Sequence, residues 1–253
     1  MSELYTIAHK MVDKGKGILA ADESTPTCTK RFSSINTDST TESRNFYRNM
    51  LFTTEDIEKY ISGVILFDET FHQSELSTGI KFPEYLTSKN ILPGIKVDQG
   101  LEDFSPYEKL TKGLDGLSER LGKYYALGAR FAKWRAVITP GDSIPTDDCI
   151  LANAKNLAKY AKKCQQANLV PIVEPEVLMD GSHTIDESFD ITSRTLNMVF
   201  NQLDEHNVSL QGIVLKPNMI LSGYECSIRQ VLKKLLKKLL IVYLLMFHQK
   251  FLE

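Results

Sequence analysis

Polar side chains, most of them charged, recur two residues apart within apolar segments of this chain. The four pairs are Lys96 and Asp98, Lys133 and Arg135, Glu174 and Glu176, and Lys216 and Asn218, and Asp22 closes the first apolar segment. Residues i and i+2 of a β-strand point to the same face of a sheet. If the segments are strands, each pair presents two polar groups together. The alternative is that charges at strand ends simply meet water.

Lysines gathered beside carboxylates suggest imine chemistry. Burial and neighbouring lysines both disfavour the ammonium form, and the neutral amine attacks ketones. Lys216, in GIVLKPN (212–218), is the candidate nucleophile, and Glu174 and Glu176 can move protons while the carbinolamine loses water. A protonated imine then withdraws electrons from the next carbon–carbon bond, which indicates aldol cleavage or condensation without a metal. The alternative for Lys216 is a lysine that buries its stem and keeps its ammonium in water.

The order of the segments that position these groups predicts alternating strands and helices. The apolar runs are GILAAD (17–22), GVILF (63–67), GIKVD (94–98), FAKWRAV (131–137), VPIVEPE (170–176) and GIVLKPN (212–218). Helical periodicity occupies 151–166 and 191–206. This order predicts βα units and a parallel sheet. About six units in a row favour a (β/α) barrel, whose active site lies at the carboxyl ends of the strands. No GxGxxG follows the first run, which argues against a dinucleotide fold.

Composition places the chain among soluble globular proteins. Hydrophobic residues make up 42% and charged residues 25%, with a formal net charge of −2. Nothing in this balance indicates nucleic acid as a partner. The first residues contain no apolar signal core, so we expect a cytoplasmic protein. The four cysteines form no CxxC pair, which predicts reduced thiols rather than a structural zinc site.

An ordered set of motifs carries a family resemblance. The motifs are ILAADEST (18–25), GVILF (63–67), GIKVD (94–98), GLDGLSER (113–120), FAKWR (131–135), CQQ (164–166), VPIVEPE (170–176) and LKPNM (215–219). Together they resemble class I fructose-bisphosphate aldolase. The resemblance implies a TIM (β/α)₈ barrel and a lyase of glycolysis and gluconeogenesis. Its reaction would be reversible cleavage of fructose 1,6-bisphosphate to dihydroxyacetone phosphate and glyceraldehyde 3-phosphate through a lysine Schiff base, with no metal and no cofactor.

The same resemblance assigns roles to individual residues. Lys216 resembles the family's Schiff-base lysine, Glu174 its proton-transfer glutamate, and Asp22 the aspartate that assists carbon–carbon cleavage. Glu176 lies beside Glu174. The expected active-site cations, which also suit a bisphosphate substrate, are Lys133, Arg135 and Lys96. One substrate phosphate is expected at Ser24, Lys30 and Arg31.

Partners follow from the same resemblance. It implies a phosphosugar substrate, a homotetramer and, as a second role in the family, cytoskeletal partners. Nucleic acid and membranes are not expected. An enzymatic alternative is another Schiff-base barrel that acts on a different phosphosugar. The non-enzymatic alternatives are a cytoskeletal scaffold and a membrane-surface protein.

The family pattern stops after GYEC (223–226). The strand ends FLSGGQS and SYGR that resemble the family's second phosphate site do not follow. We therefore expect an aldolase-like barrel over 1–226, with about six βα units present and the last two missing. Residues 227–253 would form a tail outside the family. Weak or absent activity is expected of the chain as written, because an incomplete barrel leaves strand edges unpaired.

The tail has three interpretations. It can be a basic amphipathic helix for a membrane surface or a partner, since its apolar run is too short for the roughly 20 residues that span a bilayer. It can belong to a truncated pseudogene product. The third is a frameshift that begins between Cys226 and Val231. In the shifted frame, Met246 and Phe247 force a valine, and the following codons allow VPPEISGI, which resembles a family segment. We favour the frameshift.

Overall fold

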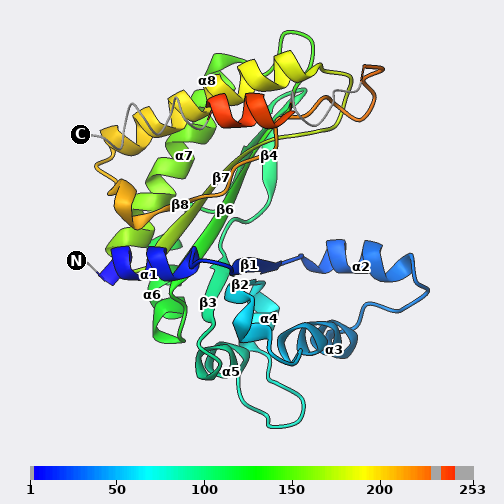
Figure 1. Ribbon diagram of the computed structural model, residues 1–253, viewed down its shortest axis with the longest axis vertical. Coiled ribbons are helices and arrows are strands. Elements are labelled where there is room, and N and C mark those ends of the chain that lie inside the picture. Colours follow the sequence, from blue (N-terminus) through cyan, green and yellow to red (C-terminus); the bar gives the residue numbers. More distant parts are fainter. Residues whose placement is uncertain (1–2, 229–234, 243–253) are drawn as a thin grey trace.

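One curled parallel sheet organises the structure, a computed structural model in which residues 3–228 and 235–242 are described (Figure 1). Its strands lie in chain order: β1 (Gly17–Ala21), β2 (Ile61–Leu66), β3 (Leu92–Lys96), β6 (Phe131–Ile138), β7 (Val170–Val177) and β8 (Val214–Leu215). Every pairing within it is parallel. Six consecutive parallel strands joined by helices confirm the predicted barrel class.

Helices connect and cover the strands. They are α1 (Glu3–Met11), α2 (Thr25–Ser33), α3 (Thr41–Phe52), α4 (Asp68–His72), α5 (Phe82–Ser88), α6 (Leu117–Ala126), α7 (Asp147–Gln166) and α8 (Ile185–Glu205), with short 3₁₀ turns η1 (Ile57–Lys59) and η2 (Leu210–Gly212). An antiparallel hairpin of β4 (Leu101–Ser105) and β5 (Glu108–Thr111) interrupts the alternation. In Figure 1, α2 and α3 project together beyond the end of β1.

The two long helices begin earlier than periodicity predicts. The α7 helix is capped by Thr146, whose Oγ1 accepts a hydrogen bond from the amide of Cys149. The α8 helix begins with a capping box in which Thr184 and Glu187 satisfy each other's backbone amides. Capping residues are polar and lie before the apolar stripe. A search for apolar spacing therefore finds the middle and end of each helix but not its first turns.

Two other sequence predictions differ from the structure. The predicted strand over 212–218 is reduced to Val214–Leu215. The Lys216 amide still donates to Val173 O at 2.9 Å, but Pro217 has no amide hydrogen to continue the ladder. Lys216 thus lies just after the strand rather than within it. The hairpin of β4 and β5 has no counterpart in the sequence analysis, because β4 is largely exposed and lacks an apolar run.

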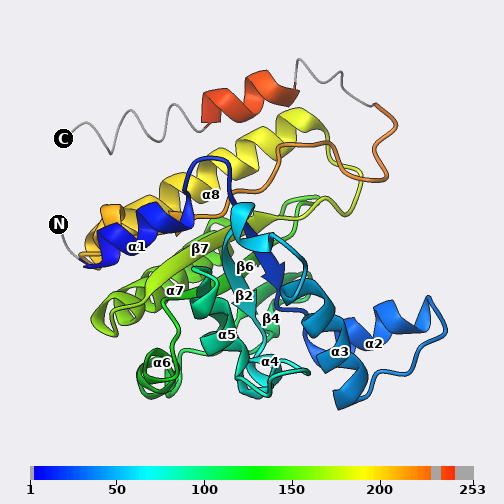
Figure 2. The same cartoon turned by 60° about the horizontal axis from the view of Figure 1, so that its bottom comes forward.

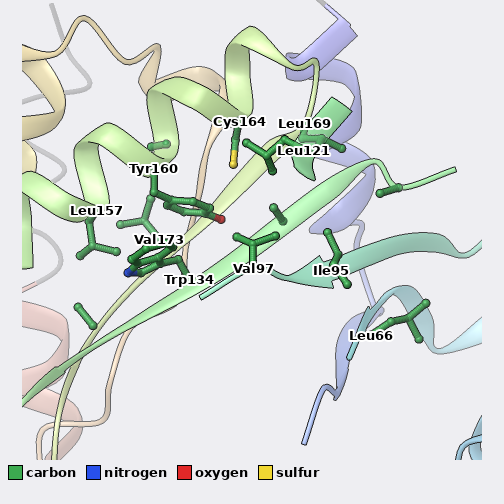
Figure 3. Packing of buried hydrophobic residues seen from close by; sticks show 14 of the residues in the cluster. Leu66, Ile95, Val97, Leu121, Trp134, Leu157, Tyr160, Cys164, Leu169 and Val173 are labelled. Atoms are coloured by element: carbon green, nitrogen blue, oxygen red, sulfur yellow. The ribbon is translucent and has the colours of Figure 1, made fainter. Parts of the chain in front are cut away.

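The outer face of the sheet holds the main core. Trp134 on β6 and Val173 on β7 pack against Leu157, Tyr160 and Cys164 of α7, as Figure 3 shows. The Trp134 and Tyr160 rings lie 5.5 Å apart between centroids. All five side chains are fully buried. This packing fixes β6 and β7 against one helix, and their opposite faces are left to point into the barrel.

The inner face changes character along the strands. Near the strands' amino ends it is apolar and packs against α1; the residues of this cluster include Ile7, Ala8, Met11, Ile65, Phe131, Val170 and Ile172. Period-two alternation then carries Phe131 to Lys133 and Ile172 to Glu174 on the same face. Apolar side chains therefore fill the barrel near the strands' amino ends. The next inward-facing positions along the strands carry charged side chains.

Gly94 gives a direct test of this inner packing. A Cβ added there would lie 2.1 Å from the Phe131 ring, which also lies over Gly63. Gly94→Ala should lower the free energy of unfolding by about 1–3 kcal/mol, because the ring cannot move without opening the apolar end of the barrel. Gly122→Ala, at an exposed and uncrowded position of α6, should instead be neutral or stabilising by up to about 1 kcal/mol. Urea unfolding measures both, and equal stabilities of the two variants would contradict the packing described.

A helical segment of the tail, residues 235–242, lies beside α8 (Figure 2). Leu235 and Leu239 pack against the main core and Val242 is buried. Lys238 forms an ion pair with Asp186 at 2.5 Å. The rest of the predicted tail, 229–234 and 243–253, lies outside the described residues. The origin of the tail, including the frameshift, stays a prediction.

Candidate active site

Four charged side chains, two from within β6 and β7 and two from just past β1 and β8, meet inside the curled sheet. Lys216 Nζ lies 2.5 Å from Glu174 Oε1. Lys133 Nζ lies 3.1 Å from Glu174 Oε2 and 3.1 Å from Asp22 Oδ2. The order is therefore ammonium, carboxylate, ammonium, carboxylate. We call Asp22, Lys133, Glu174 and Lys216 the charge cluster.

Burial differs sharply within the charge cluster. The side chains of Glu174, Lys133 and Asp22 are 4%, 7% and 10% exposed, whereas that of Lys216 is 43% exposed. A buried charge is tolerated only when it is paired, and each buried member here has an opposite partner. Lys216 is the one member of the cluster that an entering molecule can reach readily.

Electrostatics keep Lys133 protonated. Burial acts to lower the pKa of Lys133, but Asp22 and Glu174 outweigh it and hold that pKa above its ordinary value. The sequence-based expectation that crowded lysines depress one another's pKa is wrong for this residue. The expectation fails because the Glu174 carboxylate lies between Lys133 and Lys216. Lys133 is thus a permanent positive charge at neutral pH.

The raised pKa of Lys133 has a consequence for stability. The pKa of Lys133 is higher in the folded than in the unfolded chain. The stability that Lys133 gains from its ion pairs with Asp22 and Glu174 is therefore complete below the ordinary pKa of 10.5, and it is lost as pH rises through the folded-state pKa. The free energy of unfolding should therefore fall more steeply as pH rises above 10.5 in the native chain than in Lys133→Met. Urea titrations across this range measure the difference. Lys123→Met, which removes an exposed lysine, should keep the native slope, and a native slope in Lys133→Met would contradict the account.

A second tier of charge lies next to the cluster. Arg135 pairs with Glu176 across β6 and β7, and both side chains are partly exposed. Lys96, at the end of β3, pairs with Asp98. The i and i+2 positions of β6 and β7 therefore do share one face, as the sequence analysis expects. The fourth pair does not, because Asn218 follows the end of β8 and donates a hydrogen bond to Thr192 of α8.

The three residues expected at a phosphate lie on α2 or directly before it. Ser24 precedes that helix and its Oγ lies 3.1 Å from Thr27 Oγ1. Arg31 pairs with Glu23, and Lys30 is exposed. Over the part of the chain that the structure describes, Ser24, Lys30 and Arg31 make no hydrogen bond or ion pair with the charge cluster. Their role at a substrate phosphate stays a prediction.

One buried residue escaped the sequence analysis. Arg48 is 1% exposed and reaches from α3 to the end of β1. Its Nε donates to Ala21 O at 2.7 Å and its Nη2 to Glu23 O at 3.0 Å. The i and i+2 spacing of strands does not apply to Arg48, because it sits on a helix. A sequence signal exists, however, in two arginines one turn apart, Arg44 and Arg48, both on the buried side of α3.

Comparison with known proteins decides the family. The family model "Fructose-bisphosphate aldolase class-I" matches residues 3–242, nearly the whole chain. The chain belongs to the class I fructose-bisphosphate aldolases. Members of this family are lyases, so the resemblance drawn from the sequence motifs is confirmed.

Individual relatives agree with the family match. A probable fructose-bisphosphate aldolase class 1 from Xanthomonas axonopodis pv. citri is 51% identical over 228 residues, which are 89% of this chain and 68% of the relative. The fructose-bisphosphate aldolase of Plasmodium falciparum is 51% identical over 229 residues, 89% of this chain and 62% of the relative. This chain thus spans about two thirds of the length of these aldolases.

A solved structure shows the same fold. It is fructose-bisphosphate aldolase from Plasmodium falciparum, in complex with TRAP and a small-molecule inhibitor. The TM-score is 0.91 at 46% identity, over 97% of this chain and 71% of that one. Among residues 3–228 and 235–242, no helix has the length and apolar character needed to cross a membrane.

Proposed function

We propose that the charge cluster performs the family's Schiff-base aldol reaction, the reversible cleavage of fructose 1,6-bisphosphate to dihydroxyacetone phosphate and glyceraldehyde 3-phosphate. The observation that carries the proposal is the 2.5 Å contact between the reachable ammonium of Lys216 and the buried carboxylate of Glu174. A nucleophilic lysine needs a partner that takes up and returns protons. Glu174 stands at hydrogen-bond distance for both tasks.

The first half of the reaction makes the imine. Glu174 takes one proton from Lys216, and the neutral amine attacks the ketone carbon of the sugar. The resulting carbinolamine loses its hydroxyl as water after Glu174 returns a proton to it. The product is a protonated imine on Lys216. No proton is created or lost, because Glu174 ends in the state in which it began.

The second half breaks the carbon–carbon bond. Asp22 takes the proton of the hydroxyl on C4, and the electrons of the C3–C4 bond move into the protonated imine. Glyceraldehyde 3-phosphate leaves, and an enamine remains on Lys216. Lys133 keeps its positive charge beside both Asp22 and Glu174, so it stabilises negative charge that forms between them. The proton taken up by Asp22 balances protonation of the enamine carbon, and hydrolysis of the imine by water then releases dihydroxyacetone phosphate and frees Lys216.

The structure favours Lys216 over Lys133 as the nucleophile. Lys133 is held between two carboxylates that raise its pKa, so its neutral amine is scarce. It is also nearly fully buried. Lys216 contacts one carboxylate and has a side chain that is 43% exposed. The exposure of Lys216 and the raised pKa of Lys133 therefore both point to Lys216.

The remaining predicted residues form the binding part of the proposal. Arg135 and Lys96 flank the charge cluster and offer cations to the sugar phosphate. Ser24, Lys30 and Arg31 are proposed to hold one phosphate. Glu176, half-buried and paired with Arg135, is proposed to support proton transfer from beside Glu174. The backbone amides that open α2 would add favourable dipoles for an anion.

A substrate panel tests the reaction assigned. Although the activity of the chain as written is expected to be weak, it should cleave fructose 1,6-bisphosphate faster than fructose 1-phosphate, and both faster than unphosphorylated fructose, because fixed cations beside the charge cluster attract phosphate. Aldehyde release followed over time measures the three rates. Preference for a different phosphosugar would instead support another Schiff-base enzyme of the same architecture.

We further propose a cytoplasmic location. All four cysteines, Cys28, Cys149, Cys164 and Cys226, are buried and unpaired, which suits a reducing compartment. A homotetramer, usual in the family, and cytoskeletal partners, a second role in the family, stay predictions for this chain.

A further inference from the structure

Arg48 holds the backbone on both sides of Asp22. Its guanidinium donates to Ala21 O at 2.7 Å and to Glu23 O at 3.0 Å. These are the carbonyls of the residues immediately before and after Asp22. One rigid group therefore holds the peptide unit that enters Asp22 and the peptide unit that leaves Glu23.

The guanidinium itself is fixed in place. It forms an ion pair with Glu23 Oε2 at 3.0 Å, and its Nη1 lies 3.5 Å from Cys28 Sγ. Only 1% of Arg48 is exposed. A guanidinium presents its donors in a planar fork, so burial and three separate partners leave it one orientation.

Asp22 needs such support because the sheet does not provide it. The β1 ladder ends at Ala21, which pairs with Leu66, and Asp22 lies one residue beyond. Its carboxylate nevertheless lies 3.1 Å from Lys133 on a strand that is not a neighbour of β1. Another element must aim that carboxylate across the barrel.

We propose that Arg48 is a positioning residue for Asp22 in the carbon–carbon step. The inference rests on the proposed function, because it presumes that Asp22 takes the C4 hydroxyl proton. Arg48 is buried and bonds to Ala21, Glu23 and Cys28 rather than to Lys216, so its loss should leave imine formation intact. We call the hydrogen bonds from Arg48 to Ala21 O and Glu23 O the clamp. Without the clamp Asp22 can move, and a displacement of about 1 Å can lower the rate on the order of 100-fold.

The α3 helix supplies a matched control. Arg44 lies one turn before Arg48, is also buried, and pairs with Glu69 through Nε at 2.7 Å and Nη2 at 2.6 Å. It has no hydrogen bond to residues 21–23. Arg44→Gln and Arg48→Gln therefore remove the same chemical group from the same helix, but only Arg48→Gln frees Asp22.

The experiment separates imine formation from bond cleavage. Excess protein is mixed with fructose 1,6-bisphosphate and quenched with borohydride at successive times. Borohydride adds hydride to the imine carbon and leaves a stable secondary amine. Mass spectrometry then gives the fractions of Lys216 that carry the six-carbon adduct and the three-carbon adduct, and their conversion rate reports cleavage. The chains compared are the unmodified protein, Arg48→Gln, Arg44→Gln, Asp22→Asn and the double variant Asp22→Asn/Arg48→Gln.

The expected result is specific to a positioning role. Arg48→Gln should form the six-carbon adduct as the unmodified chain does but convert it on the order of 100-fold more slowly. Arg44→Gln should leave conversion close to that of the unmodified chain, because Arg44 bonds to Glu69 and not to residues 21–23. The double variant should be no slower than Asp22→Asn, because a clamp has no effect once its carboxylate is gone.

Other outcomes overturn the proposal in distinguishable ways. Normal conversion in Arg48→Gln, or multiplied losses in the double variant, overturns the positioning role and leaves the proposed function standing. No adduct on the unmodified chain overturns the proposed function and this inference with it. If Arg48→Gln does not fold, Arg48→Lys replaces it. That variant keeps the charge but lacks the fork, and native conversion in it would equally refute the clamp.

Discussion

Replacing Lys216 with methionine should reduce cleavage of fructose 1,6-bisphosphate by about 10⁴-fold or more, the scale seen when a covalent nucleophile is lost. Methionine keeps an apolar stem of similar length but has no amine to attack the ketone. The fold should persist, because the Lys216 side chain is 43% exposed and only its tip contacts Glu174. Single-turnover cleavage rates measure the effect, and circular dichroism checks the fold.

A control variant tests whether the loss of activity comes from the Lys216 amine or from the loss of any positive charge. Lys123→Met removes an exposed lysine that pairs with Glu119 on α6, away from the charge cluster. Its cleavage rate should equal that of the unmodified chain. If Lys216→Met retained even a tenth of the native rate while folded, Lys216 would not be the nucleophile and the mechanism proposed would fail.

The second large effect is expected at Glu174. Glu174→Gln keeps the shape of the side chain but cannot shuttle a proton, so cleavage should fall by about 10²–10⁴-fold. Stability should fall as well, by about 1–3 kcal/mol, because the carboxylate that serves both Lys133 and Lys216 is buried and its loss leaves their charges less compensated. Cleavage assays and urea unfolding measure the two consequences separately.

The comparison variant for Glu174 is Glu119→Gln. It also removes a carboxylate from an ion pair with a lysine, but on the exposed surface of α6. Exposed pairs contribute little to stability, so this variant should keep both activity and stability nearly unchanged. Native activity in folded Glu174→Gln would remove Glu174 from the proton-transfer role and leave Lys216 without its proposed partner.

Much of the site could be predicted because strand geometry is local. The i and i+2 spacing in FAKWR and VPIVEPE places Lys133 with Arg135 and Glu174 with Glu176 on one face, as the β6 and β7 strands show. Parallel strands of a barrel end at one rim, so charges at successive strand ends must converge. Those two facts need no knowledge of long-range contacts.

What the sequence could not provide was the pairing across the barrel. Whether Lys133 faces another lysine or a carboxylate depends on strand order and stagger, and the structure places Asp22 and Glu174 on either side of it. Arg48 escaped for a related reason. It belongs to a helix, and nothing local states that its guanidinium returns to the carbonyls around Asp22.

The central claim is that Lys216 forms the imine, and borohydride trapping followed by peptide mapping tests it most directly. The chain is incubated with dihydroxyacetone phosphate, reduced, digested and examined for the three-carbon adduct. The account predicts the adduct on Lys216, with Lys133 and Lys96 unmodified. An adduct on Lys133, or none on any lysine of the folded chain, would contradict it.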